Sequence, residues 1–317
     1  MPKTCTELTR HVLNGPTMGT RWSVLFFARP GVALAPIQTA LQQAVDEVDA
    51  QMSLWKPDSD LMRLNRAPPG TWVDLPAPLA GVLALGLAVG RASDGAFDVG
   101  LGDAVQAWGF GPQAADAAAI RTALTRPRQP AHALLELSGL KACKHGALHL
   151  DLNGIAKGYG VDRLADVLRA FGFGSALVSL DGEVRALGLR PEGEGWNVAL
   201  EAPEPGRRAA HAMLVLQDAA VATSGDYRHW VRVQGRRLSH TMDPRRGAPL
   251  AASPASVTVV APTCTEADAW ATALMVLGPE AGAALATRQG LSALWLLRGA
   301  GDALQVRGCG PVFATAV

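Results

Sequence analysis

The sequence lacks the features that mark several specialised classes of protein. Its 29 lysines and arginines nearly balance 28 aspartates and glutamates, which gives a formal net charge of +1. Such a balance offers no electrostatic attraction to a nucleic acid. No stretch approaches the roughly 18 uninterrupted apolar residues of a membrane-spanning helix, and residues 1–10 contain no apolar segment of the secretory type. We therefore expect no nucleic-acid partner, no transmembrane segment and a cytoplasmic location, or a periplasmic one if a leader has been removed.

Cysteine is scarce as well. The four cysteines are widely scattered and form no CxxC pair; they are Cys5, Cys143, Cys264 and Cys309. Neither a disulfide framework nor a zinc site is indicated. The chain also lacks a GxSxG elbow, which argues against Ser–His–Asp acyl transfer. It contains neither GxGxxG nor GxxxxGK[ST], so the Rossmann and P-loop rules for phosphate binding do not apply.

Apolar periodicity divides the chain into a largely helical first half and a strand-rich second half. Residues 36–52, 79–89 and 114–126 have helical spacing, and a strand is expected at residues 20–28. Short β-type runs separated by Gly, Pro and Asp turns follow at residues 176–180, 184–187, 196–200, 212–216, 219–223, 230–233, 256–260 and 291–296. The sequence contains no internal repeat. This order predicts an α+β fold in which helices pack on a mixed or antiparallel sheet.

The most informative stretch is DLNGIAKGYGVD, residues 151–162. An alternating run at residues 147–150 precedes it and predicts a strand, whereas apolar residues at helical spacing follow it. Gly154 and Gly158 would let the backbone approach a ligand closely, and the N–H groups of a helix N-terminus suit an anion. Lys157 adds a positive charge at the same place. The stretch is compatible with a phosphate-ester site and equally with a helix start that has a glycine-tolerant turn.

A second stretch, residues 263–278, predicts a helix over residues 266–277 with Thr265 as its N-cap. Asp268 and Thr272 stand four residues apart and therefore share one helical face. A carboxylate and a hydroxyl are hard oxygen donors of the kind that Mg2+ takes, especially where phosphate oxygens and water complete its shell. The simpler alternative is that Asp268 stabilises the helix dipole and that Thr272 bonds to its own backbone.

Two further motifs carry potential catalytic groups. ATSGDYR, residues 222–228, is dense in hydroxyl and amide donors, and LSHTMDPRRG, residues 238–247, places His240 and Asp243 beside a proline-led turn. A lone histidine is more often structural, but its neighbours make His240 an acid/base candidate, and Asp243 is the second catalytic candidate of this motif. Taken together, the four stretches fit metal-assisted chemistry at a phosphoester or pyrophosphate.

These motifs and several others occur in an order that resembles the FAD:protein FMN transferase family, also called ApbE. The motifs are MGT (18–20), MSLWKPDSDLMRLN (52–65), GAFD (95–98), WGFGP (108–112), DLNGIAKGYGVD, ATSGDYR, SHTMDPRRG and EADAWATALMVLG (266–278). The resemblance runs from about residue 16 to residue 280. It implies an ApbE-like fold over residues 16–317, as a single domain or two intertwined subdomains, after an N-terminal extension of residues 1–15.

The resemblance implies an enzyme that binds FAD and Mg2+ and breaks the FAD pyrophosphate. Such an enzyme passes FMN to a threonine or serine hydroxyl of an acceptor flavoprotein, which carries a Ser/Thr flavinylation motif, and releases AMP. Some relatives mainly hydrolyse FAD to FMN and AMP, so an FAD pyrophosphatase is the alternative enzyme. A third hypothesis is a non-catalytic FAD-binding protein, against which the presence of His240, Asp268 and Thr272 argues.

The resemblance also implies roles for particular residues. It assigns Mg2+ to Asp268 and Thr272, together with the main-chain carbonyls of Gly154 and Ala271. His240 would help to deprotonate the accepting hydroxyl. The residues that would line the FAD site are Met18, Trp55, Ala96, Phe97, Asp98, Asp151, Lys157 and Met242.

Four positions depart from the family's usual pattern. Arg246 replaces a threonine, Gly100 replaces a hydroxyl residue, and Asn153 replaces a glycine. Trp55 replaces a tyrosine and could still stack on a flavin or adenine ring. None of the four is a proposed metal ligand, but Arg246 and Gly100 bear on acceptor choice and turnover.

Overall fold

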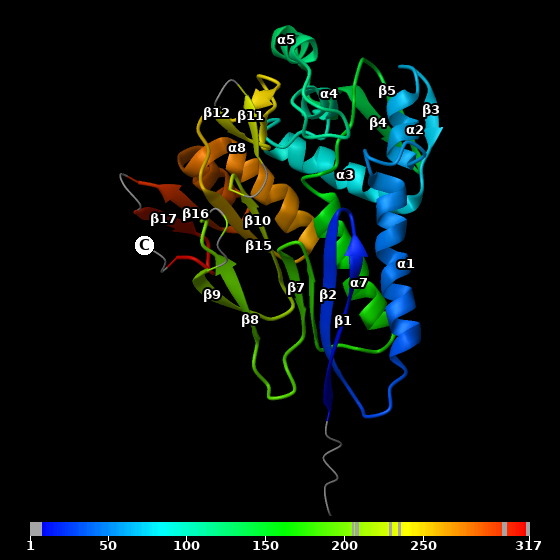
Figure 1. Ribbon diagram of the computed structural model, residues 1–317, viewed down its shortest axis with the longest axis vertical. Helices are drawn as coiled ribbons and strands as arrows, with labels where there is room; N and C mark the ends of the chain where they lie inside the picture. The colour runs from blue at the N-terminus through cyan, green and yellow to red at the C-terminus, as the bar shows by residue number, and fades with distance from the viewer. Residues whose placement is uncertain are drawn as a thin grey trace, which may run out of the picture.

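The computed structural model describes residues 8–204, 206, 209–227, 230–233, 236–299 and 303–314, without the side chains of residues 231–233, 236 and 237. At its centre is an eight-stranded sheet in which all neighbouring strands are antiparallel (Figure 1). In spatial order its strands are β1 (Thr9–Thr17), β2 (Thr20–Ala28), β6 (Ala176–Leu180), β7 (Glu183–Leu187), β10 (Ala220–Gly225), β15 (Ser256–Ala261), β16 (Ser292–Arg298) and β17 (Leu304–Cys309). The antiparallel sheet and its packed helices confirm the α+β class.

One face of the sheet is covered by the long helices α1 (Leu34–Met52), α7 (Ala156–Ala170) and α8 (Cys264–Arg288). The alternating burial of the β2 side chains shows that the helices cover one face of the sheet. Trp22 and Val24 are completely buried against the helices, whereas the residues between them point to the opposite face because side chains alternate along a strand. This regular alternation is the reason that the predicted bounds of β2 agree with the structure.

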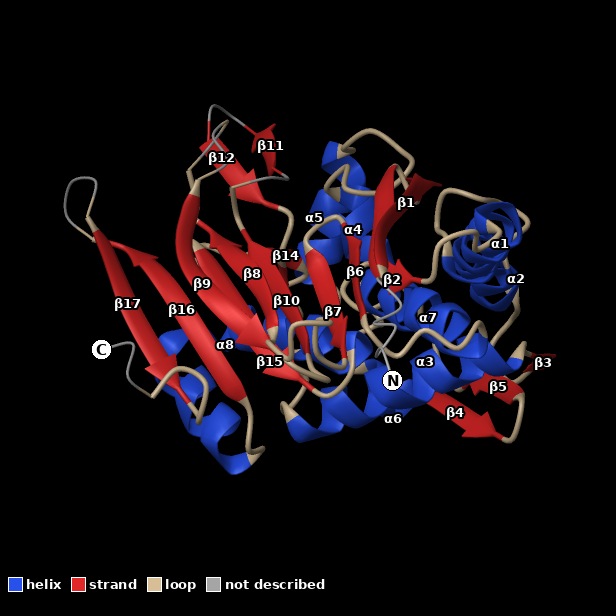
Figure 2. Ribbon diagram, turned by 90° about the horizontal axis from the view of Figure 1, so that it is seen from below, coloured by secondary structure: helices blue, strands red, loops and turns tan. Residues whose placement is uncertain are grey.

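The opposite face carries a separate two-stranded ribbon of β8 (Trp196–Glu201) and β9 (Ala210–Leu216). Figure 2 shows this ribbon beside the central strands of the large sheet. Trp196 and Leu200 of β8 are buried in one cluster with Val221 of β10 and Leu294 of β16. The ribbon and the sheet therefore form a second apolar layer of the molecule.

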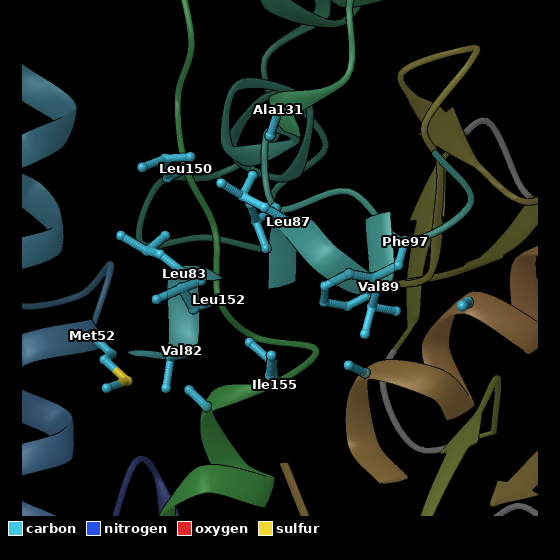
Figure 3. Packing of buried hydrophobic residues seen from close by; sticks show 14 of the residues in the cluster. Met52, Val82, Leu83, Leu87, Val89, Phe97, Ala131, Leu150, Leu152 and Ile155 are labelled. Carbon is cyan, nitrogen blue, oxygen red and sulfur yellow. The ribbon is translucent and has the colours of Figure 1, made fainter. Parts of the chain in front are cut away.

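The first half of the chain adds a helical region next to the sheet. Its elements are α2 (Asp60–Arg66), β3 (Trp72–Asp74), α3 (Ala77–Ala92), α4 (Gly102–Ala107), α5 (Ala117–Thr125), α6 (Ala131–Leu134), β4 (Leu135–Ser138) and β5 (Lys141–Lys144). Leu83, Leu87 and Ile155 belong to its core (Figure 3). The same cluster includes Trp295 of β16, so the helical region and the sheet share a continuous hydrophobic core. Two short hairpins, β11 (Trp230–Val233) with β12 (Arg236–Ser239) and β13 (Met242–Asp243) with β14 (Ala248–Pro249), lie near the sheet.

Two segments differ from what the sequence predicts. Residues 9–15, which were expected to lie in an N-terminal extension, pair with β2 as part of β1, whereas residues 1–7 lie outside the described residues. The strand expected at residues 147–150 is reduced to one parallel bridge between His149 and Leu101. Alternation in so short a run does not by itself supply a partner strand.

Helix α8 begins two residues earlier than predicted. Its N-cap is Thr263, whose hydroxyl lies 3.3 Å from the Glu266 amide and donates to the Glu266 carboxylate at 2.7 Å. Thr265, the expected cap, instead donates its hydroxyl to Asp162. The chain bends at Gly278, which has φ 74 before Pro279, and helical structure continues to Arg288. By length and hydropathy α8 could span a membrane, but Ala267, Ala271 and Leu274 are completely buried in the protein, as in a core helix.

Candidate active site

A large cleft of about 1080 Å³ opens between the helical region and one end of the large sheet. The β1–β2 turn, the β6–β7 turn and the last residues of β10 form this end. All the site residues expected from the sequence line this cleft except Asp243 and Ala271, so the structure brings together Met18, Trp55, Ala96, Phe97, Asp98, Asp151, Gly154, Lys157, His240, Met242, Asp268 and Thr272. Ala271 is completely buried in α8. Only its main-chain carbonyl could therefore contribute to a site.

The crossing of α7 and α8 fixes the position of Asp268. The Gly158 N–H donates to Asp268 Oδ2 at 3.0 Å, so this helix N-terminus already holds a carboxylate. A Cβ at Gly158 would lie 2.3 Å from the Cys264 carbonyl oxygen and 2.8 Å from Asp268 Cβ. Gly158 is thus required for close packing of two helices, and the expectation that it allows a phosphate to approach the backbone is wrong.

Thr272 lies one helical turn beyond Asp268 and meets Gly154 in the same part of the cleft. A Cβ built on Gly154 would lie 3.0 Å from Thr272 Oγ1 and 3.3 Å from the Phe97 ring. Ser224 of β10 lies 3.2 Å from Thr272, hydroxyl to hydroxyl. The side chains of one helix, one strand and one loop therefore surround a small polar corner, which we call the Asp268 corner: Asp268, Thr272, Gly154 and Ser224.

Sequence reasoning missed two acidic residues at this corner, Asp181 and Glu183. They flank Gly182 in the tight turn between β6 and β7, where Asp181 has φ 54 and Gly182 has φ 116. Lys157 Nζ bridges them, at 3.1 Å from Asp181 and 3.2 Å from Glu183. The available signal was Asp-Gly between two alternating apolar runs, the pattern of a two-residue hairpin turn.

Several carboxyl groups lie close together beside the Asp268 corner. Burial, and then the negative charge of Glu183, raises the pKa of Asp268 above its ordinary value. Burial also raises the pKa of Glu183, and its Oε2 has no hydrogen-bond partner among the described residues. For Lys157, burial acts to lower the pKa, but attraction to Glu183, Asp268 and Asp181 outweighs it and raises the pKa. Among the described residues, the carboxyl groups of Glu183, Asp268 and Asp181 thus all act on the Lys157 ammonium group, an arrangement that suits an added cation.

The residues at the Asp268 corner suit a Mg2+ ion, whose shell water and phosphate oxygens complete. They do not suit a metal that is bound only by protein side chains. No group of three or more His, Cys, Asp and Glu residues in the described chain gathers closely enough to form a metal site. The corner instead offers the Asp268 carboxylate, the Thr272 hydroxyl and the main chain of Gly154. Mg2+ is usually bound through one or two carboxylates while water and substrate phosphates supply its remaining oxygens. The corner meets that requirement.

Two further acids of the cleft, Asp98 and Asp151, are held by local hydrogen bonds. Asp98 Oδ1 accepts from the N–H groups of Gly100 at 2.8 Å and Ala131 at 3.0 Å, and burial raises its pKa. Asp151 accepts from the main-chain and side-chain N–H groups of Asn153 at 2.7 and 3.1 Å. Burial raises the pKa of Asp151 to about 6. Asn153, a departure from the family pattern, therefore anchors this carboxylate.

Gly100 and Arg246, the other departures of interest, differ in their surroundings. A Cβ at Gly100 would lie 2.6 Å from Leu148 Cδ1, so this chain leaves little space for the hydroxyl residue usual in the family. Arg246 is exposed and does not line the cleft. Its guanidinium group therefore adds no charge to the lining of the cleft.

His240 and Asp243 have separate environments. His240 lines the cleft, with its ring 6.4 Å from that of Phe110 in an edge-on arrangement. The Asp243 carboxylate accepts from the Arg245 N–H at 3.0 Å, and its carbonyl accepts from the Gly247 N–H at 2.9 Å. Asp243 thus closes the turn between β13 and β14. Trp108, from the WGFGP loop, donates to the Gly247 carbonyl at 3.0 Å and holds the same turn.

Comparisons with known proteins agree on a family. The model of the ApbE family matches residues 18–295. The FAD:protein FMN transferases of Klebsiella pneumoniae (strain 342) and Vibrio cholerae are each 34% identical to the chain, covering 92% and 90% of it and 85% and 87% of their own lengths. Among solved structures, the flavin transferase ApbE from Vibrio cholerae has a TM-score of 0.84 at 33% identity, with 95% of this chain and 97% of that chain covered. The apo flavinyl transferase ApbE of Pseudomonas stutzeri also has a TM-score of 0.84, at 37% identity and 96% coverage of both chains.

Proposed function

Because the chain belongs to the ApbE family, we propose that it catalyses Mg2+-dependent transfer of FMN from FAD to a threonine or serine hydroxyl of an acceptor protein. The observation that carries this proposal is the Asp268 corner, where a buried carboxylate and a hydroxyl adjoin a glycine main chain at one end of a large cleft. The names of the matched relatives support the same activity. The chain is accordingly an enzyme of the transferase class.

The cleft's own cations are too few to neutralise a pyrophosphate. Among the described lining residues, the ammonium groups are those of Lys56 and Lys157. Lys157 is engaged by Asp181 and Glu183, and Lys56 contacts Asp49. A bound Mg2+ would supply the missing positive charge and draw electron density from the phosphoryl oxygens. Asp268 and Thr272 would hold it, with the Gly154 carbonyl.

The remaining lining residues suit the uncharged parts of FAD. Phe97, Phe110 and Tyr227 present aromatic rings to the cleft, and Trp55 lies at its mouth with 61% of its surface exposed. Aromatic rings pack well against flat heterocycles such as flavin and adenine. Met18 and Met242 also line the cleft. Their flexible thioethers can fill the space around a ring.

The proposed reaction is a displacement at phosphorus. The acceptor hydroxyl oxygen forms a bond to the phosphorus of the FMN half, the bond from that phosphorus to the bridging oxygen breaks, and AMP leaves with the bridging oxygen. His240 lines the cleft and would take the hydroxyl proton, since histidine is a common general base. The turn closed by Asp243 and held by Trp108 supports the strand that follows His240.

The direct test is to incubate the protein with FAD and Mg2+, with and without an acceptor protein that carries a Ser/Thr flavinylation motif. Transfer predicts that the acceptor gains the mass of one FMN and that AMP appears in equal amount. Release of FMN and AMP regardless of acceptor would instead indicate an FAD pyrophosphatase. Intact bound FAD in both mixtures would indicate a non-catalytic binding protein.

Asp268→Asn provides the matched variant for this test. An asparagine oxygen can still accept the Gly158 N–H, so the crossing of α7 and α8 should be kept. We expect transfer to fall by about a hundredfold or more, because a metal ligand is lost whereas its outer-shell partners alone typically cost 10–100-fold. Parental activity in Asp268→Asn would contradict the metal assignment.

A further inference from the structure

Strand β8 borders the cleft through its edge. Val198, Ala199 and Leu200 are consecutive, and all three line the cleft. Val198 and Leu200 are buried against the large sheet, whereas Ala199 is exposed on the opposite side of the ribbon. Side chains that point in opposite directions cannot meet one cavity from the same face. The backbone edge of β8 therefore forms this wall of the cleft.

Only one edge of β8 is paired within the described part of the chain. Its partner is β9, in antiparallel register from Trp196 opposite Leu216 to Leu200 opposite Ala212. An antiparallel strand directs alternate N–H and C=O groups to each of its edges. Over residues 196–200, the edge away from β9 is thus a row of donors and acceptors that can add another strand.

The space beside this edge has an apolar floor. The Trp196 ring lies 6.0 Å from that of Phe27 on β2, and its indole N–H donates to the Leu187 carbonyl at the end of β7. The start of β8 therefore overlies the β7–β2 side of the large sheet. Leu25, Phe27 and Leu177 on that side are only partly buried and pack against the ribbon's core. Inward side chains of an added strand would cover them.

The outer surface of the ribbon is apolar as well. Met213 and Val215 of β9 are 58% and 68% exposed, and they stand opposite Ala199 and Asn197 of β8. A third strand would place alternate side chains next to Ala199 on this surface. Both faces of an added strand would then find apolar neighbours.

We propose that the free edge of β8 binds an extended segment of the acceptor protein, which adds as a third strand to the β8–β9 ribbon and carries its hydroxyl residue into the cleft. This inference rests on the proposed function. Continuity identifies the occupant, since β8, His240, Asp268 and Thr272 line one cleft. An accepting hydroxyl must enter that cleft. Four residues of an added strand span about 13 Å, so the segment that pairs with β8 can extend into the cleft. Strand addition would let main-chain hydrogen bonds provide affinity for acceptors of varied sequence.

The test uses nine-residue peptides centred on the modified hydroxyl of a protein that the full-length enzyme flavinylates. In one series, each peptide amide is N-methylated in turn, and the KM for peptide transfer is measured at saturating FAD and Mg2+. Strand addition predicts an alternation along the peptide. Methylation at every second position should raise KM by about fivefold or more, because the loss of one hydrogen bond costs about 1 kcal/mol. Methylation at the positions between should have little effect on KM.

Hydrogen exchange gives a second readout that does not depend on turnover. A peptide with alanine in place of its hydroxyl residue should slow exchange of amides within residues 196–201 and leave the already paired amides of β9 unchanged. Uniform or absent effects of N-methylation, with transfer intact, would overturn the inference and leave the proposed function standing. Failure of every acceptor protein to gain FMN would overturn both. Protection of β8 without peptide, rising with protein concentration, would assign the edge to a second copy of the chain and also overturn the inference.

Discussion

Individual carboxyl groups in the cleft are placed where they oppose folding and favour ligand binding. Asp151 and Asp268 are buried, and burial is the first cause of the raised pKa of each. A buried carboxylate without a cation costs free energy unless it is hydrogen-bonded or takes a proton. Local bonds from Asn153 and Gly158 offset part of that cost. A cation or a substrate group that enters the cleft and contacts these carboxyl groups would remove the remaining free-energy cost of burying them.

Asp151→Asn should change the pH dependence of stability. The pKa of Asp151 is about 6 in the folded protein against 3.8 as the ordinary value. The folded state therefore holds the proton more tightly, so the carboxyl group's contribution to stability falls as pH rises from about 4 to about 6 and stays low above it. We expect the variant to escape this loss, which amounts to about 3 kcal/mol at most.

Urea unfolding at pH 4.5 and pH 7.5 measures this effect. Asp151→Asn should gain on the parent at pH 7.5 relative to pH 4.5, because the amide does not titrate and can still accept the Asn153 N–H. Asp58→Asn, which alters an exposed acid, serves as the control and should follow the parent. Parallel behaviour of Asp151→Asn and the parent at the two pH values would contradict the burial argument.

At the level of whole elements, the crossing of α7 over α8 sets the geometry of the site. Gly158 allows the two helices to approach, and its N–H orients the carboxylate that α8 presents. Asp162, one turn later on α7, accepts from the N–H groups of Cys264 at 3.0 Å and Thr265 at 2.9 Å. One helix therefore fixes the N-terminus of the other. The position of Asp268 depends on this contact as much as on the sequence of α8.

Gly158→Ala should weaken both folding and catalysis. The new methyl group would lie 2.3 Å from the Cys264 carbonyl oxygen, so the helices must separate. We expect the free energy of unfolding to fall by about 1–3 kcal/mol, as overpacking usually does, and transfer activity to fall because Asp268 moves. Gly81→Ala is the matched control, since Gly81 lies in α3 with nothing within 4 Å of its Cβ position.

Denaturant unfolding and FMN transfer measure the two effects of Gly158→Ala together. Gly81→Ala should unfold at equal or higher denaturant concentration, because alanine is favoured over glycine in a helix by about 0.5–1 kcal/mol. If Gly158→Ala were as stable and active as Gly81→Ala, the close crossing would not be a requirement of the site.

The sequence predicts elements well where one face is buried. Alternation identifies β2 and β6 with the bounds seen in the structure, and helical spacing identifies most of α1. It fails at residues 147–150, because a short alternating run carries no information about a pairing partner. It also misplaces the cap of α8, although the three-residue spacing from Thr263 to Glu266 is the pattern of a capping box.

The candidate site was predictable only in part, for a related reason. Asp268 and Thr272 share a helix, so their spacing alone predicts that they lie on one helical face. The contacts of Lys157 with Asp181 and Glu183 join a helix to a hairpin turn, and no local pattern specifies them. The surroundings of His240 and Asp243 also depend on the tertiary structure, because His240 lines the cleft whereas Asp243 closes the turn between β13 and β14.

For the whole molecule, a near-neutral chain encloses an acidic site. The net charge is +1, yet the carboxyl groups of Asp268, Asp181 and Glu183 all lie near the ammonium group of Lys157. A pyrophosphate would add further negative charge to this region. Metal and FAD should therefore bind cooperatively, since each supplies charge or ligands that the other needs, and linkage requires the effect to be mutual.

The most direct measurement is the binding of Mn2+, an EPR-visible substitute for Mg2+, with and without FAD. We expect Mn2+ to bind at least about tenfold more tightly in the presence of FAD. Asp268→Asn and Thr272→Val should lose this tight binding, whereas Thr272→Ser, which keeps the hydroxyl, should retain it. Equal Mn2+ affinity with and without FAD, or unchanged tight binding in Asp268→Asn, would contradict the assignment of the metal to the Asp268 corner.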